Sequence, residues 1–162
     1  DMAANGKLHP VRIAAGALGH DLPRADLRVS RQHRVLVSGA AARTAFGNDE
    51  VLVPAIKLAG LPGIAVEAAD TALRYVHLLF DRHEVVLANG APAESLLAAP
   101  GALALMPTTL RDSMPPAPLA RVPARALPEN GRAIRAFRAR LQETGAPPLA
   151  VAPAGAAEPR RA

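Results

Sequence analysis

Ser30 and His33 are the residues whose types and spacing first suggest chemistry. They stand three positions apart in Leu-Arg-Val-Ser-Arg-Gln-His-Arg-Val-Leu-Val, residues 27–37, and an apolar run follows them directly. A bend between two strand pieces can point a hydroxyl and an imidazole at one peptide bond. The imidazole can then hold or protonate the amide nitrogen, while the hydroxyl steadies the carbonyl oxygen. The alternative is structural: Ser30 caps a turn, and His33 is a half-buried strand residue.

A second imidazole, His83, opens another apolar run, His-Glu-Val-Val-Leu-Ala-Asn-Gly, and follows Asp81 closely. A ring whose nitrogen is fixed by a carboxylate is a better-defined acid or base. We therefore predict that Asp81 and His83 form a second acid/base pair, against the alternative of a surface histidine beside an acidic residue. Because each imidazole opens a strand, we further predict that His33 and His83 face one another across a small sheet.

His77 lies in the same apolar pattern as His83 and raises the question of a metal site. Alternation along a strand would put His77, Leu79 and Asp81 on one face, although Asp81-Arg82 interrupts the pattern. Two or three imidazoles with a carboxylate could bind a metal, but this spacing matches no tight metal motif. We predict no metal and no cofactor. Dinucleotide, Walker, His-Glu-x-x-His and Gly-x-Ser-x-Gly motifs are also absent from the sequence.

Composition excludes several classes of function. The net charge is +5, but only two of the 19 basic residues are lysines and the arginines are scattered, so we predict no nucleic-acid partner. The sequence has no cysteine, which excludes disulfides, zinc–thiolate sites and a cysteine nucleophile within these residues. No apolar run approaches membrane-spanning length and Asp1–Gly6 does not resemble a signal peptide, so we predict no membrane partner.

The elements that must position these residues are short strands. Val, Leu and Ile concentrate between Val11 and Leu97, and turn signals recur at intervals of about ten residues, a pattern typical of an all-β fold. Residues 74–80 are the most convincing strand, whereas 38–49 read as small and turn-forming residues and 55–58 as one helical turn. The other predicted strands are 9–13, 27–29, 34–37, 50–55 and 84–88.

The second half of the chain has a different composition. Most of the 16 prolines follow Ala91, which argues against a second packed domain. One helix is credible, with Asn130 as N-cap and Gly145 as stop. The predicted division is therefore a β domain over 1–97, a Pro-rich linker over 98–130, a short helix over 131–145 and a disordered tail over 146–162.

Four blocks of the sequence, in order, resemble the bacterial Hint domain of the Hedgehog/intein family. They are Pro-Val-Arg-Ile-Ala-Ala-Gly-Ala-Leu-Gly (10–19), Asp-Leu-Arg-Val-Ser-Arg-Gln-His-Arg-Val-Leu (26–36), Glu-Val-Leu-Val-Pro-Ala (50–55) and Tyr-Val-His-Leu-Leu-Phe-Asp-Arg-His-Glu-Val (75–85). The order of four blocks is far more specific than any single block. The likeness covers roughly residues 9–97 and carries no information about the tail.

The resemblance implies an all-β, horseshoe-like fold and self-cleavage or splicing at the domain's own N-terminal junction. In that family a Cys or Ser at the first residue attacks the preceding carbonyl and forms a thioester or ester. A Thr-x-x-His block assists, and Ser30 and His33 match it. A later histidine that precedes Asn-Gly is matched by His83, with Asn89 and Gly90.

The sequence also departs from the family pattern. No Cys-containing block precedes Asp1, and the His-Asn ending of splicing inteins is not found after Gly90. The resemblance therefore implies cleavage rather than splicing. We expect the chain to be the C-terminal portion of such a domain, without its first strands and its nucleophile and inactive when isolated. Its partner would be its own upstream flanking polypeptide.

Two other functions stay open at this point. One is a non-catalytic β scaffold or adhesion-type module with a disordered tail, which would be indifferent to both histidines. The other is a hydrolase with a histidine-bound metal, which the spacing of the imidazoles does not favour.

Overall fold

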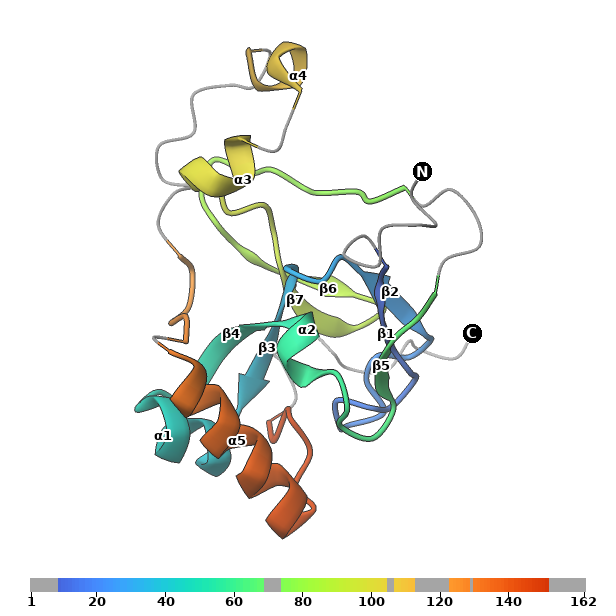
Figure 1. The fold of residues 1–162 in the computed structure, drawn as a ribbon, viewed down its shortest axis with the longest axis vertical. Helices are drawn as coiled ribbons and strands as arrows, with labels where there is room; N and C mark the ends of the chain where they lie inside the picture. Colours follow the sequence, from blue (N-terminus) through green and yellow to red (C-terminus); the bar gives the residue numbers. More distant parts are fainter. Residues whose placement is uncertain (1–8, 69–73, 105–106, 113–122, 129, 152–162) are drawn as a thin grey trace, which may run out of the picture.

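The structure, a computed structural model, describes residues 9–68, 74–104, 107–112, 123–128 and 130–151. Its strands form two antiparallel sheets, a three-stranded one in the order β2-β1-β5 and a four-stranded one in the order β4-β3-β7-β6 (Figure 1). The predicted β class is confirmed, with several short helices added. In chain order the elements are β1 Val11–Ile13, β2 Leu27–Val29, β3 Arg34–Ser38, α1 Ala40–Phe46, β4 Glu50–Pro54, α2 Ala55–Leu58, β5 Ile64–Val66, β6 Val85–Ala88, β7 Ala91–Glu94, α3 Pro100–Ala104, α4 Thr108–Asp112 and α5 Gly131–Thr144.

The pair β3 and β4 is the centre of the larger sheet. Both strands are rich in Val and Leu, which suit a pleated, buried surface. They pair along their full length, from Arg34 opposite Pro54 to Ser38 opposite Glu50. Their Val side chains are fully buried in the core that both sheets share. This rigid pair fixes the position of the bend that precedes β3.

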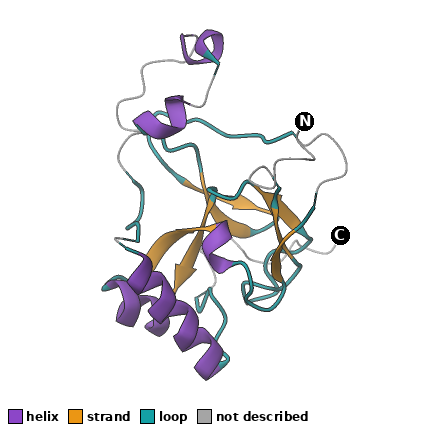
Figure 2. Cartoon of the chain, viewed as in Figure 1, coloured by secondary structure: helices purple, strands orange, loops and turns teal. Residues whose placement is uncertain are grey.

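Helix α5 confirms the predicted helix and its two ends. The Asn130 side chain accepts a hydrogen bond from the Ala133 N–H at 3.0 Å, and Gly145 ends the helix in a left-handed conformation with φ 67°. Phe137, on the apolar face of the helix, is fully buried and lies 5.2 Å from Phe46 of α1, measured between ring centroids. Helices α1 and α5 lie side by side (Figure 2). The helix is therefore part of the folded body.

Residues 146–151 correct the predicted disordered tail. Leu149 is fully buried, and its N–H donates to the Leu18 carbonyl at 2.9 Å. The Ser38 N–H donates to the Pro148 carbonyl at 3.0 Å. Prolines cannot donate, but their carbonyls accept, so this segment satisfies polar groups at the end of β3. Residues 152–162 lie outside the described part of the chain, and the domain boundaries themselves stay a prediction.

Residues 74–80 correct the strongest strand prediction, because the structure has no strand there. Val76, Leu78 and Phe80 are 72%, 52% and 43% exposed. Strand propensity needs a neighbouring strand to become a strand, and β7 already pairs with β3 on one side and β6 on the other. The segment is held instead by a hydrogen bond of 2.7 Å from the Leu96 N–H to the Leu78 carbonyl.

The sequence reading also missed α1, β5 and β7. Alanines favour the helix between Gly39 and Gly47, where the sequence predicts turns. Strand β7 reads Ala-Pro-Ala-Glu and carries no β-branched residue, yet it is buried throughout. None of the helices in the described residues combines the length and the apolar composition that a transmembrane span requires.

Candidate active site

The register of the larger sheet gathers the candidate residues at one end. Val35 of β3 lies opposite Ala93 of β7, so His33 precedes β3 next to the point where β7 ends. Val85 of β6 lies opposite Glu94, so His83 reaches the same end from the other side. Three neighbouring strands therefore bring together residues that are far apart along the chain.

Glu94 is the centre of this arrangement, and the sequence reading missed it. Its side chain is only 8% exposed. One carboxylate oxygen, Oε1, accepts the Arg34 N–H at 2.8 Å, and Oε2 accepts Nη1 of the same arginine at 3.0 Å. Oε2 also lies 3.3 Å from Nε2 of His83. The usable signal was the Asn-Gly turn at 89–90, because a tight hairpin there sets Glu94 opposite Val85.

His33 sits in a bend that the backbone holds firmly. Its N–H donates to the Ser30 carbonyl at 3.1 Å, which closes a turn. The bend is also fixed to the first residues of α2: the Ala55 N–H donates to the His33 carbonyl at 2.9 Å, and the Ile56 N–H donates to the Arg31 carbonyl at 3.0 Å. These N–H groups are free to do so because the first turn of a helix has no internal acceptors for them. Ser30 is half-buried in the same bend.

The surroundings of His33 favour the neutral form of its ring. Burial lowers the pKa of His33, and nearby His77 and Arg34 act in the same direction, while Glu94 opposes them. The His77 ring lies 5.9 Å from the His33 ring, centroid to centroid, at an interplanar angle of 36°. A neutral imidazole on which a buried carboxylate acts electrostatically can accept a proton and have its positive charge stabilised.

His83 is in a different situation from His33. Its side chain is fully buried, and Nδ1 accepts a hydrogen bond from the Ala124 N–H at 2.9 Å. The ring proton must then be on Nε2. Nε2 lies 3.3 Å from Oε2 of Glu94, but the two atoms are not aligned for a hydrogen bond. The predicted pair of His83 with Asp81 is therefore wrong, because the carboxylate beside the ring is Glu94 and Asp81 is exposed. The buried His83 ring therefore lies next to the Glu94 carboxylate and away from solvent.

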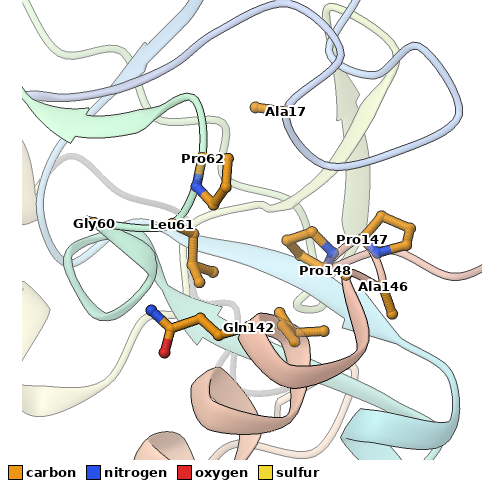
Figure 3. Close-up of a pocket in the computed structure, with 10 residues that line it drawn as sticks. Ala17, Gly60, Leu61, Pro62, Gln142, Ala146, Pro147 and Pro148 are labelled. Atoms are coloured by element: carbon orange, nitrogen blue, oxygen red, sulfur yellow. The ribbon is translucent and has the colours of Figure 1, made fainter.

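The described residues contain no group of three or more His, Cys, Asp or Glu arranged to hold a metal ion. A pocket of about 490 Å³ lies elsewhere, where the C-terminal end of α5 and the turn after it meet the α2–β5 loop (Figure 3). Leu61, Leu141 and three prolines line it among small residues, and Gln142 brings a polar side chain. It shares no residue with the site around Glu94.

Glu94 and Asp81 make a matched pair for mutagenesis. Glu94→Ala leaves the Arg34 N–H and the half-buried guanidinium without their acceptor, so we expect a loss of about 1–3 kcal/mol in the free energy of unfolding. Asp81→Asn, at an exposed position, should change it by less than about 0.5 kcal/mol. Urea unfolding followed by circular dichroism measures both. Equal effects of the two substitutions would contradict the central place of Glu94.

The lowered pKa of His33 makes stability depend on pH. In the unfolded chain the imidazole takes up a proton near its ordinary pKa of 6.5, whereas the folded state takes it up only at lower pH. The unfolded state therefore binds more protons just below that pH, and stability falls as pH decreases through this window. His33→Gln should flatten the difference in urea midpoint between pH 7.5 and more acidic buffers. An unchanged slope in the variant would contradict this prediction.

Comparison with known protein families gives one match. The family model described as the Hint domain matches residues 1–100, which is more than half of the chain. Comparison with curated proteins and with solved structures finds no match. The match includes the bend with Ser30 and His33 and the hairpin with His83 and Glu94. The chain therefore belongs to the Hint domain family.

Proposed function

We propose that this chain is part of an autoprocessing domain of the Hedgehog/intein type, which promotes cleavage of a peptide bond in its own precursor through an N-to-S or N-to-O acyl shift. One observation carries the proposal: the histidine of the matching Ser-x-x-His block lies in a bend held by backbone hydrogen bonds, where burial lowers its pKa and the charge of the buried Glu94 carboxylate acts in the opposite direction. That arrangement suits an imidazole that takes up a proton and gives it away again at neutral pH.

The first step of the proposed reaction is an acyl shift that begins with a proton transfer to His33. Neutral His33 accepts the proton of a thiol or hydroxyl as the sulfur or oxygen bonds to the carbonyl carbon of the preceding residue. Glu94 stabilises the imidazolium, and the Ser30 hydroxyl donates to the oxygen that becomes negative. When the C–N bond breaks, the imidazolium returns the proton to the nitrogen. The products are a thioester or ester and a free amine, with no net gain or loss of protons.

In this proposal the nucleophile is a Cys or Ser at the junction between the domain and its flanking polypeptide. The chemistry requires a Cys or Ser at the junction, and the 162 residues contain no cysteine. The domain's partner in this proposal is thus its own flanking polypeptide. In a second step, water or another nucleophile attacks the thioester or ester and releases that flank.

The test uses the complete precursor polypeptide that contains these 162 residues. Intact mass should show two products whose masses add up to the precursor plus one water. Hydroxylamine, which attacks thioesters and esters directly, should accelerate the release of the upstream product. Replacement of the junction Cys or Ser by Ala should stop both reactions. A precursor whose mass stays intact even in hydroxylamine would overturn the proposal.

One observation favours the non-catalytic alternative. Val76, Leu78 and Phe80 expose apolar surface on one segment, as a module that binds another protein would do. That alternative predicts no cleavage in any polypeptide that contains the domain and no effect of His33 substitutions.

A further inference from the structure

A second imidazole accompanies His33, and the first step does not use it. The His77 ring is 5.9 Å from the His33 ring and is exposed to solvent. In an extended segment, side chains alternate between faces, so His77 points away from its outward neighbours Val76 and Leu78. Tyr75 and Leu79, on the same side as His77, are half-buried, which agrees with a ring that faces the domain.

No other histidine both lies against the His33 ring and is exposed to solvent. The chain has five, at positions 9, 20, 33, 77 and 83. His83 is fully buried and its Nδ1 already accepts the Ala124 N–H, so a water molecule from solvent does not reach its ring. Among these five, His77 is the one that stands against the His33 ring and also meets bulk water.

Resting on the proposed function, we propose that His77 is the catalytic base of the second step, the hydrolysis of the thioester or ester. His77 takes a proton from a water molecule as the water oxygen bonds to the acyl carbon. The C–S or C–O bond breaks, and His77 returns the proton to the leaving sulfur or oxygen. The products are a carboxylic acid and the restored thiol or hydroxyl, and water is the only co-reactant.

In this proposal each ring serves one step, according to its exposure to solvent. His33 is half-buried and fixed by α2, which suits a proton transfer within the polypeptide. Hydrolysis needs a water molecule that enters from solvent and a base that meets it there. The Leu96 N–H donates a hydrogen bond to the Leu78 carbonyl, and this bond keeps the neighbouring His77 beside His33.

The experiment compares His77→Ala and His33→Ala in the complete precursor, with water alone and with hydroxylamine. His77→Ala should slow hydrolysis about 100-fold, the size typical of a lost general base, while hydroxylamine still releases the upstream product at a rate close to the parent. Added imidazole should restore part of the hydrolysis. His33→Ala should lose both reactions. His20→Asn is the control, because His20 is exposed with φ 54°, a conformation that asparagine tolerates.

The possible results distinguish a failure of the role of His77 from a failure of the proposed function. Hydrolysis at the parent rate in His77→Ala would overturn the role of His77 and leave the proposed function intact. Loss of the hydroxylamine reaction in that variant would also overturn it, since His77 would then serve the first step or the fold. A parent that does not react with hydroxylamine would remove the proposed function, and the role of His77 with it.

Discussion

Replacement of His33 by alanine is expected to abolish self-cleavage of the precursor, with a rate loss of about 10²–10⁴-fold, the range for a positioned acid or base. In the proposed first step the ring both takes the proton of the nucleophile and returns it to the amide nitrogen, so one substitution would remove both transfers. The measurement is the fraction of precursor cleaved with time, by intact mass, with hydroxylamine present so that the second step does not limit the rate.

His20→Asn serves again as the matched control and should cleave like the parent. The unfolding midpoint of each variant must be measured beside the rate, because the bend at His33 is held through its backbone and should survive the substitution. Cleavage by folded His33→Ala at the parent rate would contradict the role given to this ring. A variant that fails to fold is replaced by His33→Gln, which keeps a side chain of similar reach.

Phe137→Ala is expected to cause the largest loss of stability, about 3–5 kcal/mol, as for other fully buried aromatic residues. Phe137 is fully buried and packs on Phe46 of α1, so its removal leaves a cavity between α5 and the rest of the fold. The free energy of unfolding in urea measures the loss. The matched control is Arg135→Ala, exposed on the same helix, which should change stability by less than about 0.5 kcal/mol.

A loss below about 1 kcal/mol for Phe137→Ala would show that α5 is only loosely attached. The predicted sequence division, in which this helix stands apart from the β domain, would then describe the protein better than the packed arrangement. The same experiment therefore decides whether the region beyond the family match is part of the folding unit.

The sequence predicted the elements in which local preference and burial agree. Strands β3 and β4 are continuous runs of Val and Leu, and they are the buried centre of the larger sheet. Helix α5 has an Asn cap, a Gly stop and apolar residues on one face, and it begins and ends where those signals stand. Each of these elements carries its own evidence within a few residues.

The sequence failed where long-range pairing decides. Residues 74–80 have strand propensity, but no strand lies beside them to pair with. Strand β7 has little strand propensity, yet it pairs with both β3 and β6. Strand pairing also decides which carboxylate lies next to His83. Asp81 is close to His83 along the chain, but the carboxylate that reaches the ring is Glu94, because the hairpin register sets it there. Local spacing along the sequence does not contain that information.

The short segment around Ala124 and Ala126 has a practical consequence. The family match ends at residue 100, yet the Ala126 carbonyl accepts the Leu52 N–H at 2.9 Å and the Ala124 N–H binds His83. A polypeptide cut after residue 100 would lose the chain that shields the outer side of β4, which is the kind of bare strand edge that seeds aggregation. Anyone who transplants this domain into another protein should carry the sequence through Val151.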